Sequence, residues 1–273
     1  MPNLNPNHIF TIWISENPPD NLNFRCWKSW IDLGYEVSIF VDEFYGRTWS
    51  LPDYLHGQKL IRNLSQIMGK SLFTLKEGEK ILHKVDFLRF YILNKYGGAW
   101  IDSDMLLIKR LPPDPIIISS ENTLQSGFKK SKEIYKPNIG VLRFCPGHPF
   151  TKAVVEKMCP TTAEDLKDGM NSTSKMLKFI KMLKLKKWAH MNQFVVEPQI
   201  YCPVPFPFAK ELYTKHLLDV VDTKYGLEFN YIDDTTVAVH LWNNFKKNKF
   251  KIEEKDIHPE SLYKNLLQWN GKQ

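Results

Sequence analysis

Two carboxylates stand two residues apart in an otherwise apolar stretch, at Asp102 and Asp104. Residues i and i+2 of an extended chain point to the same side, so the spacing predicts two negative charges aimed at one point. Such charges repel each other and resist burial, and a hard divalent cation with oxygen ligands relieves both problems. The pair is therefore a candidate metal site, although a short Asp-x-Asp motif by itself is most often a solvated turn.

The elements expected around this pair strengthen the functional interpretation. Apolar residues recur at three- and four-residue steps between positions 81 and 92, which predicts an amphipathic helix. Asp86 and Arg89 share another face of that helix, where they can pair or reach the same ligand. Gly97-Gly98 ends the helix, because glycine tolerates the left-handed conformation of a C-cap. Residues 100–108 then read as a buried strand that the polar triplet interrupts.

The start of the chain predicts strand, helix and strand in turn. Residues 8–15 form a short run rich in β-branched and aromatic residues, residues 23–33 carry apolar residues at helical spacing and stop at Gly34, and residues 35–41 alternate. This order is typical of the opening of a parallel α/β sheet. A chain of 273 residues is long enough for one large α/β domain or for two small ones.

Residues 85–104 carry Val-Asp-Phe-Leu-Arg and, further on, Tyr-Gly-Gly-Ala-Trp-Ile-Asp-Ser-Asp. This stretch resembles the core signature of the DXD glycosyltransferases of the mannosyltransferase and α-1,4-galactosyltransferase-like group (glycosyltransferase family 32-like), which the large clostridial glucosylating toxins share. The resemblance implies a GT-A fold, which is Rossmann-like with a mainly parallel central sheet flanked by helices. It also implies a nucleotide-sugar donor, with UDP as the nucleotide, and a Mn²⁺ or Mg²⁺ ion.

The resemblance extends to the blocks at 8–41, 137–150 and 236–244. It implies one domain over residues 1–273 with helical inserts, including one expected within 44–80. The nucleotide-binding half is expected at about 1–110 and the acceptor side at about 111–273.

Site residues follow from the same resemblance, position by position. Asp102 is expected to contact the ribose or sugar and the metal, and Asp104 to coordinate the metal directly. Asp86 and Arg89 are expected to hold sugar hydroxyls, in a reaction that retains the anomeric configuration. Trp13 is expected to stack on the uracil base, although it reads equally well as a core residue of the first strand.

Further donor-binding positions are implied at Gly98, Asn138, Trp242 and Asn243, and a third metal ligand at His240. From the residues alone, Asn138 also reads as a turn residue after proline, and a lone histidine on a strand is more often a satisfied core residue. The proline-dense segment 197–208 is expected to form neither a central strand nor a helix.

The net charge of +7 is compatible with nucleic acid, an anionic membrane or a phosphorylated ligand. Six lysines lie between Lys175 and Lys187, where the usual solvated surface competes with a peripheral membrane contact. The four cysteines lack metal-type spacing and read as reduced thiols. With neither a signal peptide nor a membrane span in the sequence, a cytoplasmic location is expected.

Other functions fit the same carboxylate pair. A phosphoesterase or nuclease would need more acidic ligands grouped nearby, which the sequence does not show, and a nucleotide-sugar hydrolase would use the same site. A glycan-binding module without activity would be expected to lack one of the two carboxylates. The favoured prediction is a hexosyltransferase acting on a saccharide, a glycolipid or a protein, with no nucleic-acid partner.

Overall fold

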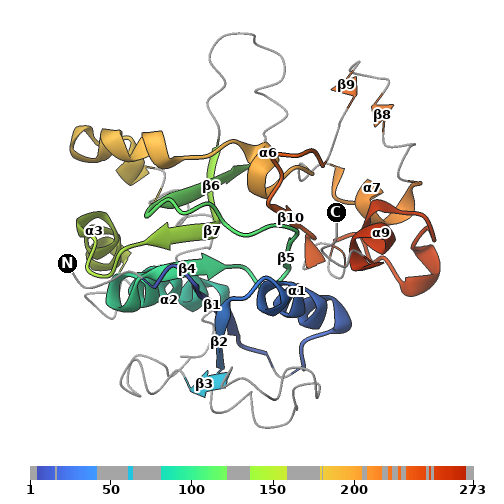
Figure 1. The fold of residues 1–273 in the computed structure, drawn as a ribbon, viewed down its shortest axis with the longest axis horizontal. Helices are drawn as coiled ribbons and strands as arrows, with labels where there is room; N and C mark the ends of the chain where they lie inside the picture. The colour runs from blue at the N-terminus through green and yellow to red at the C-terminus, as the bar shows by residue number, and fades with distance from the viewer. Residues whose placement is uncertain are drawn as a thin grey trace.

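The computed structural model describes residues 5–15, 17–41, 61–63, 81–121, 136–158, 179, 181–204, 208–216, 221–222, 227–228, 232–243, 246 and 249–268. A six-stranded sheet lies at its centre, in the order β3-β2-β1-β4-β7-β6 (Figure 1). The bounds of these strands, in chain order, are β1 His8–Trp13, β2 Glu36–Val41, β3 Ile61–Asn63, β4 Gly98–Ile101, β6 Ile117–Glu121 and β7 Lys136–Phe144.

Strand direction confirms the expected fold class. The pairs β1–β2, β1–β4 and β2–β3 are parallel, whereas β7 is antiparallel to both β4 and β6. Five of these six strands therefore run the same way, and β7 runs against them. Helices α1 (Asn21–Asp32), α2 (Ile81–Tyr96) and α3 (Pro149–Met158) pack on this sheet. The result is a mixed α/β domain with a mainly parallel central sheet flanked by helices.

The two faces of the sheet carry separate apolar clusters, because strand side chains alternate in direction. One cluster joins β-strand residues such as Ile9 and Ile101 to Trp27 and Trp30 of α1. The other joins Phe10 and Trp100 to α2, α3 and the segment around residues 179–191. Helix α1 thus covers one face, while α2 and α3 cover the other.

The register between β1 and β4 places the carboxyl ends of both strands at the same edge of the sheet. Phe10 pairs with Trp100 in parallel, so Trp13 and Asp102 both follow at the carboxyl ends of their strands. In open α/β sheets, ligands bind beyond the carboxyl ends of parallel strands. This edge is therefore where a site is expected.

The chain leaves the main sheet directly after β4. Residues 102–104 form a turn in which the Met105 amide donates to the Asp102 carbonyl at 3.0 Å. Strand β5 (Met105–Leu107) then pairs antiparallel with β10 (Ala238–His240) in a second, two-stranded sheet. The expected interruption of the strand is confirmed, but the extended geometry assumed for the pair is wrong, because a turn does not place residues i and i+2 on one side.

The remaining elements lie mostly toward the C-terminus. They are η5 Lys186–Phe194, α6 Pro198–Tyr201, α7 Glu211–Thr214, β8 Val221–Asp222, β9 Leu227–Glu228, η8 Glu254–Asp256 and α9 Leu262–Gln268. The helix-free expectation for 197–208 is wrong at α6, because proline is tolerated in the first turn of a helix. The helical insert expected within 44–80 lies outside the described residues, except for 61–63, which form β3. In the part of the chain described, no helix combines the length and apolarity needed to cross a membrane.

Candidate active site at the Asp102–Asp104 turn

Strand β5, which follows the turn at residues 102–104, is held by helix α1. The Trp30 indole N–H donates to the Met105 carbonyl at 2.9 Å, and the Leu107 amide donates to the Ser29 hydroxyl at 3.1 Å. Both contacts fix β5 against the helix immediately beyond the two aspartates. Because β5 also pairs with β10, the turn lies where three elements distant in sequence meet.

Asp102 is bound to the main sheet and to α2. Its Oδ1 lies 3.2 Å from Nη2 of Arg89 and accepts from the Trp100 indole at 2.8 Å. The Arg89 guanidinium lies 4.9 Å from the centre of the Trp100 ring. The Asp102 side chain keeps 27% of its surface exposed, so its other oxygen can meet a ligand.

Arg89 is shared between two carboxylates. Its Nη2 lies 3.3 Å from Asp86, and its Nη1 donates to the Ile139 carbonyl of β7. Burial raises the pKa of Asp102, and the Arg89 guanidinium opposes that shift. Arg89 is therefore turned toward protein carboxylates rather than outward, although the expected sugar contact stays a prediction.

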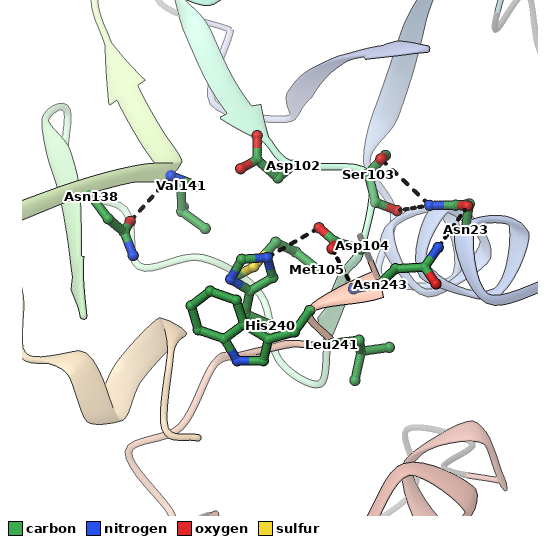
Figure 2. A network of polar contacts seen from close by, with 12 residues as sticks. Asn23, Asp102, Ser103, Asp104, Met105, Asn138, Val141, His240, Leu241 and Asn243 are labelled. Atoms are coloured by element: carbon green, nitrogen blue, oxygen red, sulfur yellow. Dashed lines mark hydrogen bonds and ion pairs between the residues drawn. The ribbon is translucent and has the colours of Figure 1, made fainter. Parts of the chain in front are cut away.

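Asp104 faces the C-terminal strand. Its Oδ1 lies 3.2 Å from Nε2 of His240, and its Oδ2 accepts from the Asn243 amide at 2.9 Å. Burial alone would raise the pKa of Asp104, but His240 and these hydrogen bonds hold it below its ordinary value. Burial alone would lower the pKa of His240, but Asp104 raises it well above its ordinary range. The two side chains form an ion pair, and the carboxyl groups of Asp102 and Asp104 point in different directions (Figure 2).

Trp242 and Cys202 support His240. The Trp242 ring stacks on the imidazole at 4.1 Å between centroids, and its indole N–H donates to the Val204 carbonyl at 3.1 Å. Trp242 has φ of 51°, a left-handed conformation that is uncommon for a bulky residue. Cys202 is hydrogen-bonded to His240. Trp242 is only 5% exposed, so the structure gives it a contact with His240, and donor contact stays a prediction.

Asn138 lies on β7 beside Asp102. Its side-chain carbonyl accepts from the Ser119 hydroxyl and from the Gly140 amide, the latter at 3.1 Å. Both bonds engage the oxygen and so orient the amide, and contact of Asn138 with a donor or acceptor stays a prediction. A Cβ added at Gly140 would lie 3.5 Å from Oδ2 of Asp102 and 3.6 Å from the Asn138 oxygen. A side chain there would therefore enter the space between the two residues, which glycine leaves open.

Trp13 and Gly98 lie at opposite ends of their strands. Trp13 is partly exposed at the carboxyl end of β1. Its ring lies at 80° to that of Trp27, with the two ring centroids 6.3 Å apart. Gly98 begins β4 with φ of 86°, and an added Cβ would lie 3.0 Å from the His8 carbonyl. The structure thus explains Gly98 by close packing of β1, four residues from Asp102, while Trp13 lies at the same edge as the turn.

One protein family matches the part of the chain that contains the turn. Residues 20–123 match the family described as a glycosyltransferase sugar-binding region containing a DXD motif. The matched segment contains both Asp102 and Asp104. The resemblance predicted from the sequence is therefore confirmed.

The similarity of this chain to an individual curated protein is low. The chain is 22% identical over 188 residues to human alpha-1,4-N-acetylglucosaminyltransferase, covering 66% of this chain and 48% of that protein. The chain thus spans about half the length of this curated relative.

Solved structures also show similarity. PaToxG glycosyltransferase is 14% identical with a TM-score of 0.46, covering 69% of this chain and 74% of its own. The galactosyltransferase LgtC, in a complex with donor and acceptor sugar analogues, is 13% identical with a TM-score of 0.40. That alignment covers 86% of this chain and 87% of LgtC.

The two carboxylates are oxygen ligands of the kind that a hard cation takes together with a phosphate. Among the described residues, no three His, Cys, Asp or Glu side chains converge into a metal-binding group. Mg²⁺-type sites commonly use one or two protein carboxylates together with water and substrate phosphates, which suits Asp102 and Asp104. His240 directs its Nε2 at Asp104, so its predicted role as a third ligand would require that contact to change.

Sequence reasoning missed several residues that position this site. Trp100 binds Asp102, Ser119 orients Asn138, and Asn23 of α1 binds the turn at Ser103. Trp100 precedes Asp102 by two residues, so the alternation of the strand could have suggested it. Asn23 carries only a helix-start signal, three residues after Asp20, and nothing local shows that its side chain reaches a segment 80 residues away.

Proposed function

We propose that the chain transfers a hexose from a nucleotide sugar, UDP-linked, to a hydroxyl group of a saccharide, a glycolipid or a protein. The observation that supports this most is the DXD turn at the carboxyl edge of the sheet, within the family-matched segment. On that edge lie a partly exposed tryptophan, Trp13, and two carboxylates with solvent-accessible surface. An aromatic face suits a nucleobase, and carboxylates suit a cation that binds a diphosphate.

In this proposal Asp102 and Asp104 hold Mn²⁺ or Mg²⁺. When bound, the cation would stabilise the negative charge that develops on the departing diphosphate. Arg89 keeps the Asp102 carboxylate in place, and His240 does the same for Asp104. Trp13 would stack on the base, and the NH₂ group of Asn138 would bind a hydroxyl group of the donor or acceptor.

The proposed chemistry exchanges one bond for another at the anomeric carbon. The acceptor oxygen forms a bond to that carbon while the bond to the diphosphate oxygen breaks and the electron pair leaves with the diphosphate. The hydroxyl proton passes to the departing diphosphate. This front-face route retains the anomeric configuration and needs no protein nucleophile.

The division of labour within the chain is part of the proposal. Residues up to about 110 would bind the donor, and those from about 111 would bind the acceptor. His240 and Asn243 reach the donor turn from the C-terminal part, so the two halves would meet at that turn.

A peripheral membrane contact belongs to the same proposal. Lys184, Lys186 and Lys187 are exposed around Leu185, a large apolar side chain that is 47% exposed. Clustered lysines are attracted to anionic lipid head groups, and an exposed leucine can enter the interface. Such a contact would bring the enzyme to a lipid-linked acceptor.

A panel of nucleotide sugars, incubated with the protein and Mn²⁺, tests the donor assignment. We expect one UDP-sugar to release UDP, and the release to fall by about 100-fold or more in Asp104→Asn, because the developing charge loses its stabilisation. Mass spectrometry of an added saccharide separates transfer from hydrolysis. No nucleotide release with any donor, or cleavage of a simple phosphate ester or DNA instead, would overturn the proposal.

A further inference from the structure

Helix α1 reaches the DXD turn through one buried amide. The Asn23 side chain, in a residue only 1% exposed, donates from Nδ2 to the Ser103 carbonyl at 3.1 Å and lies 3.4 Å from the Ser103 hydroxyl. Its Oδ1 accepts from the Asp20 amide at 3.3 Å. A backbone carbonyl only accepts and a backbone N–H only donates, so these two contacts fix which way the Asn23 amide is turned.

The same amide meets the C-terminal segment. Nδ2 of Asn243 lies 3.4 Å from Oδ1 of Asn23 and donates to Asp20 at 3.1 Å. The Asn243 backbone amide donates to the Asp104 carboxylate at 2.9 Å, and the Leu241 amide donates to the Asp104 carbonyl at 3.0 Å. Figure 2 shows these contacts running from Asn23 of α1 to Ser103 and, through Asn243, to Asp104.

Ser103 is the residue between the two carboxylates. Whatever fixes its backbone fixes the relative placement of Asp102 and Asp104, whose charges otherwise favour separation. A turn that populates several arrangements binds its ligand more weakly, since the apparent affinity is reduced by the fraction of molecules in the competent arrangement.

We propose that Asn23 is a positioning residue for the cation and diphosphate site, acting through Ser103 and Asn243 and not by touching the ligand. The inference rests on the proposed function, because it assumes that the two aspartates bind a cation together with a nucleotide diphosphate. Helix α1 would then contribute to the affinity of the site for the cation and diphosphate, in addition to packing in the hydrophobic core.

Three variants test the proposal by calorimetric titration of Mn²⁺ in the presence of UDP, with thermal unfolding measured in parallel. Asn23→Ala removes the whole amide. Asn23→Ser keeps a hydroxyl near the Asp20 amide, but the serine side chain is too short to reach Ser103. This variant can be measured in place of Asn23→Ala if the alanine variant folds poorly. Ser29→Ala is the matched control, because it removes a hydrogen bond between α1 and Leu107, beyond the turn.

Both Asn23 variants are expected to raise the Kd of Mn²⁺ by about 10- to 100-fold, the range found when supporting partners of metal ligands are removed. Ser29→Ala is expected to lower the melting temperature and leave Kd within about twofold, because the turn itself keeps its contacts. An unchanged Kd in the Asn23 variants, with a melting temperature lowered as in Ser29→Ala, would overturn the inference and leave Asn23 a helix-capping residue. Failure of the wild-type protein to bind Mn²⁺ with UDP would instead refute the proposed function.

Discussion

Arg89 connects the turn at Asp102–Asp104 to the interior through a single guanidinium. It lies between Asp86 and Asp102 with 6% of its side chain exposed, and its Nε is buried without a hydrogen-bond partner among the described residues. The guanidinium opposes the rise in the pKa of Asp102 that burial causes. Its role is thus electrostatic as well as structural.

Replacement of Arg89 by glutamine is expected to raise the pKa of Asp102, because burial already raises it and the opposing guanidinium is lost. Cation binding needs the ionised carboxylate, so the loss of Mn²⁺ affinity on acidification should begin at a higher pH than in the wild type. Titrations with Mn²⁺ and UDP from pH 5 to 8 would measure this. The free energy of unfolding should also fall by roughly 3 kcal/mol, as when a buried ion pair loses one partner.

Arg143→Gln is the matched control for that variant. Arg143 is equally buried on β7, but it donates to the carbonyls of Pro6 and Asp114, at 3.2 and 3.3 Å, and not to either aspartate of the turn. It should lose stability without a change in the pH dependence of Mn²⁺ binding. The same shift in both variants would contradict the role given to Arg89.

The ion pair of Asp104 and His240 predicts how the stability of the metal-free protein depends on pH. The folded-state pKa of His240 is raised, so its contribution to stability is full below about pH 6.5 and declines as the pH rises through the folded pKa. The pKa of Asp104 is lowered, so its contribution is present above about pH 4 and is lost as the pH falls through the folded pKa.

The difference in unfolding free energy between wild type and His240→Gln should therefore be largest between about pH 4 and 6.5 and shrink above that window. Urea unfolding at a series of pH values measures it. The variant Asp104→Asn with His240→Gln should show neither dependence. A difference that stays constant from pH 5 to 9 would show that the two groups are not paired.

At the scale of the element, the junction of α2 with β4 depends on two adjacent glycines. Gly97 has φ of 68°, and an added Cβ would lie 2.4 Å from Cδ and 2.7 Å from N of Pro146. The Gly97 amide also closes the helix on the Leu93 carbonyl at 2.8 Å. The chain turns here, so that the helix end contacts the loop after β7 while Gly98 at the start of β4 pairs with Phe144 of β7.

Gly97→Ala should lower the free energy of unfolding more than Gly147→Ala does. Gly147 has nearly the same φ, 69°, but nothing lies within 4 Å of an added Cβ there. Both variants incur the left-handed penalty of about 1–2 kcal/mol, so the difference between them isolates the clash with Pro146. Denaturation in urea would measure both, with an excess of about 1–3 kcal/mol expected for Gly97→Ala. Equal losses of unfolding free energy in the two variants would show that the loop at Pro146 moves aside without an energetic cost.

At the scale of the whole molecule, surface charge predicts where a membrane would meet the protein. Binding to vesicles containing anionic phospholipid should fall by about 100-fold when Lys184, Lys186 and Lys187 become glutamine, since each lysine near such a surface contributes about 1 kcal/mol. Sedimentation with vesicles measures this, with purely zwitterionic vesicles as the reference. The triple variant of Lys210, Lys215 and Lys255, which are also exposed, changes net charge equally and should bind like the wild type. Equal loss in both triple variants would attribute binding to overall charge.

Much of the fold could be predicted because its signals are local. The first strand, helix and second strand, the helix ending at the paired glycines and the interruption at Asp102–Asp104 all follow from period, capping and turn chemistry. The geometry of Asp102 and Asp104 could not be predicted from local signals. It depends on β5, which leaves the main sheet to pair with β10, where Val239 lies opposite Leu106. Only the partner strand, 133 positions further along, decides that change of direction.

The sequence by itself determined the resemblance to the DXD glycosyltransferases, the fold class and the two carboxylates, because periodicity and a contiguous motif depend on neighbours along the chain. The tertiary structure alone decided that Arg89 serves Asp102, that His240 serves Asp104 and that Asn23 supports Ser103 between them. Each of these contacts joins elements separated by 13, 136 or 80 positions. Such distances are bridged by sheet register and helix packing, which no short stretch of sequence specifies.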